Sequence, residues 1–362
     1  MEEPLQLNVA LLRRRVPNLS QAARSIGLRP ATVSDLCTGK IPIGRAEVRT
    51  LVALSALAGC SLDDLVLRGS ASSMLETGIK PVDLLAPLVR GGVAGLIARP
   101  GVGQLVLLAE LCRTLKDRRS FATVLWLSQD DLPIPEELLD EPGATVRDLD
   151  EAEKLIADLG LEQDVFVVAE RRRAVSGELL KLRAALRERG IRPATFALYD
   201  ALGEAADSEA APFGPLDSLW QLDLDLAARM LYPALDPLAS TSTLIEAGQL
   251  EAVHLGVAQR ARRLLRRYRE WRAVVKVRGL SHLPSDEQLT FRRGELLEAF
   301  LTQPFFVAEP FTKRPGVWLP VHETLGDVRR ILDGTADDLD PKRLAYVGRL
   351  PAEPVHGSAD AA

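Results

Sequence analysis

The sequence is short of the residues from which metal centres, disulfides and many hydrolytic sites are built. Its 362 residues include only three cysteines and four histidines, and neither set shows metal-site or disulfide spacing. No Ser/His/Asp or Cys/His arrangement is found. The sequence therefore predicts no metal site, and the low cysteine content fits a reducing, cytoplasmic setting.

Long apolar runs and a strong positive charge are also missing. No run approaches the ~18–20 residues of a membrane helix, so we expect neither membrane insertion nor a secretory signal. The net charge of −5 gives no overall nucleic-acid signature, but it is uneven. Residues 1–70 hold nine basic and six acidic side chains, against 36 and 44 in the rest. A mildly basic head on an acidic body predicts two modules with different partners.

The head has the pattern of a helix-turn-helix. Helices are expected over residues 5–15, 19–26 and 30–36, with Gly27 as the break between the second and the third. The run LSQAARSIGLRPATVSDLCTGK resembles the phage-repressor (Cro-like) DNA-binding family. In that family the third helix enters the major groove, so the resemblance implies DNA as a partner.

The expected DNA contacts come from the third helix and its flanks. None of its outward residues is the Arg, Gln or Asn that makes bidentate base contacts, so most contacts would position phosphates. The DNA-binding candidates are Arg29, Ala31, Thr32, Ser34, Asp35 and Lys40. The alternative is that these helices form a protein-docking or dimerisation module.

Residues 95–110, GLIARPGVGQLVLLAE, have the layout of a phosphate-binding loop: a strand, a glycine-rich turn and a helix start. Gly101 and Gly103 would let the backbone approach an anion at the helix N-terminus. Three residues of the motif GxxxxGK[ST] are replaced: Ala98 stands at the first Gly, Gln104 at the Lys position and Leu105 at the hydroxyl position. Taken alone, the pattern also fits an ordinary strand-to-helix turn.

Four blocks of the body resemble the catalytic beta subunit of the rotary ATP synthases. They are ETGIKPVDLLAPLVRGGVAGLIARPGVGQLVLLAEL, LDSLWQLDLDLAARMLYPALDPLASTST, VAQRARRLLRRYREWRAVVKVRG and FLTQPFFVAEPFTKRPGVWLPVHETLGDVRRILDG. The blocks keep the order of the family. The resemblance implies an α/β fold: a P-loop NTPase (RecA-like) parallel-sheet core, a C-terminal helical bundle and an all-α helix-turn-helix domain where the family has a barrel.

The expected organisation follows from these two resemblances. We expect a helix-turn-helix domain at 1–70, a linker at 71–75, a degenerate P-loop ATPase-like core at 76–250, a C-terminal helical domain at 251–350 and a disordered tail at 351–362. The many acids of residues 132–155 are expected to form an acidic surface insertion.

The beta-subunit resemblance also implies an adenine pocket closed by three aromatic side chains, Tyr232, Phe305 and Phe311. Stacking on aromatic faces suits an adenine ring. The cofactor-binding candidates are Gly101, Gly103, Gln104, Leu105, Tyr232, Phe305 and Phe311. The alternative is that the three aromatics are core residues.

Catalysis is not expected. Gln104 carries no charge for a phosphate, Leu105 offers no oxygen to Mg²⁺, and the weak catalytic candidates are Asp130 and Asp200. Asp200 is expected either to orient water or a metal, or to cap the following turn.

The helix expected after residue 251 carries an apolar face of Val257, Ala261, Leu264, Tyr268 and Trp271. Its other face is rich in arginine. That face is expected to pair with nearby acids rather than with nucleic acid or an acidic protein.

The sequence thus predicts a non-catalytic protein like the ATP synthase beta subunit, repurposed as a DNA-binding regulator. It would bind ATP or ADP weakly and without Mg²⁺, and nucleotide would shift its self-association. One alternative is an accessory or assembly partner of ATPase-type subunits, with the head as a docking module. A second is a weak residual ATPase.

Overall fold

The computed structural model describes residues 5–7, 9, 12, 15–16, 19–37, 40–41, 43–60, 62–68, 74–127, 141–207 and 213–351. Asp130 and almost all of the predicted tail lie outside these residues.

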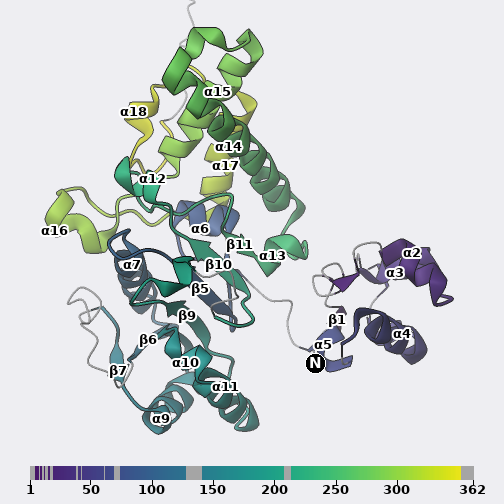
Figure 1. The fold of residues 1–362 in the computed structure, drawn as a ribbon. Coiled ribbons are helices and arrows are strands. Elements are labelled where there is room, and N and C mark those ends of the chain that lie inside the picture. Colours follow the sequence, from purple (N-terminus) through teal and green to yellow (C-terminus); the bar gives the residue numbers. More distant parts are fainter. Residues whose placement is uncertain are drawn as a thin grey trace, which may run out of the picture.

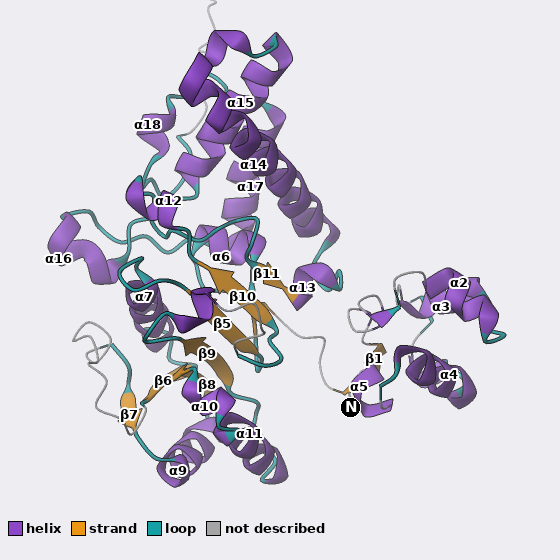
Figure 2. Cartoon of the chain, viewed as in Figure 1, coloured by secondary structure: helices purple, strands orange, loops and turns teal. Residues whose placement is uncertain are grey.

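A seven-stranded sheet forms the centre of the body (Figures 1 and 2). Its spatial order is β11-β10-β5-β9-β8-β6-β7, and every neighbouring pair is parallel except β10 and β11. The strands are β5 (Val93–Ile97), β6 (Phe121–Trp126), β7 (Ala144–Val146), β8 (Asp164–Glu170), β9 (Thr195–Tyr199), β10 (Ser218–Gln221) and β11 (Thr241–Ser242). The expected α/β fold with a parallel-dominated sheet is confirmed.

Both faces of the sheet are buried, which explains why its strands are apolar without a polar alternation. In β9, Ala197 and Tyr199 join the core on one face, whereas Phe196 and Leu198 join the core on the other. Helix α7 (Gln104–Lys116) covers the first face, and α9 (Leu149–Gly160) and α11 (Glu178–Glu188) cover the second. The short elements α10 (Arg172–Val175) and η2 (Glu204–Asp207) follow the ends of β8 and β9.

A small hairpin and a helix precede the sheet. Strands β3 (Met74–Leu75) and β4 (Leu88–Val89) pair on either side of α6 (Lys80–Leu85). The end of the expected linker is therefore a strand that pairs within the body.

The expected acidic insertion is corrected where the structure describes it. Residues 144–146 form β7 at the sheet edge, and α9 buries Ala152 and Ile156 against the sheet. Asp148 caps α9 by accepting a hydrogen bond from the Glu151 N–H, so the acids here sit at a helix start.

The C-terminal region is helical. Its long helix α14 (Ala252–Arg278) packs against α15 (Ser285–Phe300) and α17 (Val321–Asp333), as Figure 1 shows. The smaller elements are α12 (Leu224–Ala228), α13 (Thr243–Glu246), η3 (Leu280–His282), η4 (Phe306–Ala308), α16 (Glu309–Thr312) and α18 (Pro341–Leu344). The predicted apolar face of α14 is buried at Val257, Ala261 and Tyr268 and half-buried at Leu264 and Trp271.

Most arginines of α14 pair within the chain, as expected. Arg260 meets Asp333 at 2.5 Å, Arg269 meets Asp236 at 3.0 Å, and Arg272 meets Asp225 at 2.6 Å. Arg262 donates to the backbone oxygens of Leu85 and Ser240.

The head differs from its prediction at its start. Residues 5–7 form β1 (Leu5–Leu7), which pairs antiparallel with β2 (Val66–Arg68), so the expected helix over residues 5–15 is wrong there. A helical pattern does not reveal a strand whose partner lies some sixty residues away. The other described elements are α2 (Leu19–Ser25), α3 (Pro30–Cys37), η1 (Ile43–Arg45), α4 (Val48–Ala58) and α5 (Leu62–Leu65).

Candidate functional site

The glycine turn, residues 98–103, joins the central strand β5 to α7. Gly101 has φ 83° and Gly103 has φ 96°, a left-handed backbone that favours glycine. A Cβ at Gly103 would lie 3.4 Å from Cε1 of Tyr232, whereas one at Gly101 would meet no atom within 4 Å. At Gly103 the turn therefore places backbone without a side chain next to the Tyr232 ring.

Gln104 and Leu105, which stand at the Lys and hydroxyl positions of the phosphate-loop motif, point into the protein. Gln104 is 4% exposed, and its Nε2 donates to the backbone oxygen of Asp200 at 3.3 Å. Its Oε1 has no hydrogen-bond partner among the described residues. Leu105 is half-buried against the core beneath the sheet. Neither side chain lines the cleft described below.

Asp200, at the end of β9, holds the turn that follows it. Its carboxylate accepts hydrogen bonds from the N–H groups of Leu202 at 3.2 Å and Ala205 at 2.5 Å. Arg171 lies 3.9 Å away. Of the two expected roles for Asp200, the structure shows the capping contacts.

Glu170 is a second buried carboxyl group at this edge of the sheet. It ends β8, next to β9, and it accepts a hydrogen bond from the Arg172 N–H at 3.2 Å. Burial is the main cause that raises the pKa of Glu170. The described residues contain no group of three or more His, Cys, Asp or Glu side chains able to hold a metal ion.

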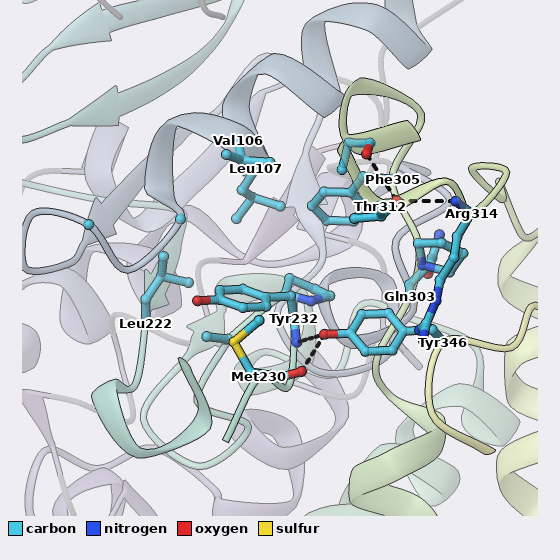
Figure 3. Close-up of a pocket in the computed structure, with 16 residues that line it drawn as sticks. Val106, Leu107, Leu222, Met230, Tyr232, Gln303, Phe305, Thr312, Arg314 and Tyr346 are labelled. Carbon is cyan, nitrogen blue, oxygen red and sulfur yellow. Dashed lines mark hydrogen bonds between the residues drawn. The ribbon is translucent and has the colours of Figure 1, made fainter. Parts of the chain in front are cut away.

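An apolar cleft of about 570 Å³ lies beside the glycine turn (Figure 3). This volume is in the range of small-molecule sites. The cleft is lined by Gly101, Gly103, Val106, Leu107, Leu222, Met230, Tyr232, Pro233, Ala234, Gln303, Pro304, Phe305, Ala308, Thr312, Arg314 and Tyr346. The wall of the cleft thus combines the glycine turn and α7 with residues from much later in the chain.

Two of the three predicted aromatics line this cleft. Tyr232 and Phe305 do, and Phe305 is only 5% exposed. Phe311 is 79% exposed and is not part of the cleft wall, because it lies on the short helix α16, which turns it outward. The prediction that Phe311 closes the pocket is therefore wrong for this structure.

Sequence reasoning missed Tyr346, which fixes the cleft wall opposite Leu222 (Figure 3). Its hydroxyl donates to the backbone oxygen of Met230 and accepts from the Tyr232 N–H at 3.2 Å. Burial is the main cause that raises the pKa of Tyr346. The scarcity of tyrosine, four in the chain, was the only sequence signal available.

Glu110 connects the helix after the glycine turn to the aromatic wall. It is 1% exposed, and its Oε2 accepts from the Val307 N–H at 3.1 Å, just beyond Phe305. Burial raises the pKa of Glu110 to about 7, although hydrogen bonds from the Val307 and Phe306 N–H groups oppose the rise.

The predicted DNA-binding residues lie on and beside α3. Arg29, Ala31, Ser34 and Lys40 are exposed, whereas Thr32 and Asp35 are half-buried. The Lys40 ammonium is 4.0 Å from the Asp35 carboxylate. Helices α2 and α3 pack together across a turn in which Gly27 has φ 78°.

Among the residues that the structure describes, no helix is long and apolar enough to cross a bilayer.

Comparison with known proteins bears on the fold. Residues 244–333, which run from α13 to the end of α17, match a family described as the C-terminal domain of V and A type ATP synthase. A solved structure, that of a unique ATP synthase subunit NeqB from Nanoarcheaum equitans, aligns with 74% of this chain and 78% of that one. The TM-score is 0.54 and the identity is 17%. Over 74% of its length the chain therefore has a fold similar to that of this ATP synthase subunit, and its C-terminal region is similar to the V and A type domain.

Proposed function

We propose that this protein is a non-catalytic accessory partner of ATPase-type subunits. The partner role is supported by the similarity of residues 244–333 to the C-terminal domain of V and A type ATP synthase. The absence of catalysis is supported by the glycine turn, which lies beside the cleft without the lysine and the hydroxyl that phosphoryl transfer uses. Gln104 and Leu105 point away from the cleft, and the Asp200 carboxylate holds backbone N–H groups. Phosphoryl transfer depends on positioning and charge neutralisation, which these residues do not supply.

The cleft itself suits a planar heteroaromatic ligand of the adenine class. The Tyr232 ring lies against Gly103, and Phe305 forms the other aromatic wall. Aromatic side chains bind a base by stacking, worth about 1–3 kcal/mol per base in nucleic-acid complexes. The residues present fit a ring; they do not fit a triphosphate with Mg²⁺, because the motif lysine and hydroxyl are absent.

Co-purification tests the partner half of the proposal. We expect the tagged chain, co-expressed with the catalytic and non-catalytic ATPase subunits of its own organism, to elute with them in a fixed stoichiometry. Separate elution of the chain at micromolar concentration would refute the proposal. The isolated chain is expected to show no ATP turnover above the background of a mock purification.

Calorimetry tests the ligand half. We expect adenosine and ADP to bind with an affinity that Mg²⁺ does not change. The double variant Gln104→Lys/Leu105→Thr restores the motif lysine and hydroxyl. A lysine at position 104 that turns from Asp200 toward the cleft should add a Mg²⁺-dependent component for ADP of about tenfold or more, since a charge-assisted contact adds roughly 1.5–3 kcal/mol. If adenosine at millimolar concentration gives no heat of binding, the proposal that the cleft binds an adenine-class ligand is refuted.

DNA binding by the head is a second candidate function. The observation behind it is that Arg29 and Lys40 flank α3 on the exposed surface of a basic segment. Gel shifts at several salt concentrations would test it. The variant Arg29→Ser/Lys40→Ser should weaken binding and flatten its salt dependence, whereas Arg24→Ser on α2 removes one charge away from α3. Equal effects from the two variants would refute a role for α3.

A further inference from the structure

We propose that Arg314 recognises a single anionic group on the ligand of the apolar cleft, and that the ligand is a nucleoside monophosphate. The inference rests on the proposed function, since it assumes that a heteroaromatic ring occupies the cleft. It adds the class of ligand and the residue that selects it.

Arg314 is the single charged residue in the wall of the cleft, as far as the structure describes it. Its guanidinium carbon lies 4.8 Å from the centre of the Tyr346 ring. Within the described part of the chain, this stacking is its one side-chain interaction, with no carboxylate paired to it. An arginine that stacks on an aromatic ring keeps its five N–H donors available for a phosphate.

The Tyr346 ring on which Arg314 stacks is held in place by hydrogen bonds. The Tyr346 hydroxyl is held by the backbone of Met230 and of Tyr232, and Figure 3 shows both contacts. The backbone N–H of Arg314 donates to Oγ1 of Thr312 at 3.3 Å, which holds the main chain from which the guanidinium extends. The cation is therefore positioned before a ligand arrives, which lowers the entropic cost of binding.

Backbone strain concentrates at the same place. The described residues include three non-glycine residues with positive φ: Met230 at 58°, Lys313 at 58° and Tyr346 at 62°. Met230 and Tyr346 line the cleft, and Lys313 precedes Arg314 in the chain. Side chains of these types rarely adopt this conformation, and such strain clusters at binding sites.

The glycine turn is a weaker binding site for the anionic group than Arg314. It offers backbone N–H groups at a helix start, but no cationic side chain of the turn lines the cleft. Gln104, at the lysine position of the motif, is neutral and donates to the Asp200 backbone oxygen. A full charge on Arg314 with bidentate geometry outweighs the partial charge of a helix terminus. One anionic group at one arginine matches a monophosphate better than a longer polyphosphate.

Calorimetry with adenosine, AMP and ATP, all without Mg²⁺, tests the inference. In the wild type we expect AMP to bind about 10- to 100-fold more tightly than adenosine, the size of a charge-assisted contact, and ATP to gain little beyond AMP. In Arg314→Gln the preference for AMP should disappear while the adenosine affinity stays. Lys313→Gln is the matched control, because it removes the neighbouring charge, whose Nζ donates to the Pro310 oxygen instead.

Each outcome decides between the alternatives. Equal binding of AMP and adenosine by the wild type refutes the role of Arg314 but leaves the cleft as an adenine site. A preference for AMP that survives in Arg314→Gln places the phosphate elsewhere and refutes the inference. Failure of both adenosine and AMP to bind refutes the inference together with the ligand half of the proposed function. Thermal unfolding of both variants checks that the exposed substitutions leave the fold intact.

Discussion

At the scale of single residues, Glu110 joins the helix after the glycine turn to the wall of the cleft. Its folded pKa of about 7 lies above the ordinary 4.5, so the folded state holds the proton more tightly than the unfolded chain. The stability gained from this protonation is fully present below pH 4.5 and is lost as the pH rises through 7. Wild-type stability should therefore fall with pH relative to a variant that cannot titrate.

The variant Glu110→Gln makes this measurable. Urea unfolding at intervals from pH 4.5 to 8 should show the wild type losing on the order of 2 kcal/mol relative to Glu110→Gln across that range. The buried Asp83, whose pKa burial also raises to about 7, is common to both proteins and cancels. Glu188→Gln, on the exposed side of α11, is the control, and a pH-independent difference for Glu110→Gln would contradict the prediction.

At the scale of elements, the glycine turn offers a matched pair of substitutions. Gly101 and Gly103 are both left-handed, so alanine at either should cost roughly 1–2 kcal/mol of stability. Only the Cβ at position 103 would contact Tyr232, where it would fill the space between the turn and the ring. We therefore expect Gly103→Ala to weaken adenosine binding several-fold more than Gly101→Ala, measured by calorimetry. Equal losses of affinity in the two variants would show that adenosine binding does not require the absence of a side chain at position 103, beside Tyr232.

The elements also show how far sequence reasoning reached. The strand, the turn and the start of α7 were predictable because glycine spacing and apolar runs are local signals, and Gln104 was correctly placed at the helix start. The strand β1 was not predictable, because it exists only through pairing with β2.

The cleft was predictable only in part, for the same reason. Tyr232 and Phe305 came from a family resemblance and do line it, but Phe311 faces solvent on α16. Tyr346 joins the wall through hydrogen bonds to a segment 114 residues earlier, a contact that the fold alone creates.

At the scale of the whole molecule, Lys80 joins the sheet to the helical C-terminal region. It is fully buried on α6, and its Nζ donates to the backbone oxygens of Phe300 and Val347. The Phe300 ring centre is 4.2 Å from Nζ. Gln303 completes the joint, because it accepts from the Lys80 N–H and donates to the Gly78 oxygen.

Lys80→Met should weaken the contact between α6 and the helical C-terminal region, because it removes the donor and nearly keeps the volume of the side chain. Two buried carbonyl oxygens lose a donor, which costs roughly 2–4 kcal/mol in the free energy of unfolding. Urea unfolding followed by tryptophan fluorescence measures the loss, and Lys116→Met at the exposed end of α7 is the control. Because Phe305 follows this joint directly, Lys80→Met should also weaken adenosine binding. A variant with wild-type stability and wild-type affinity would show that the cleft does not depend on how Lys80 connects the sheet to the helices.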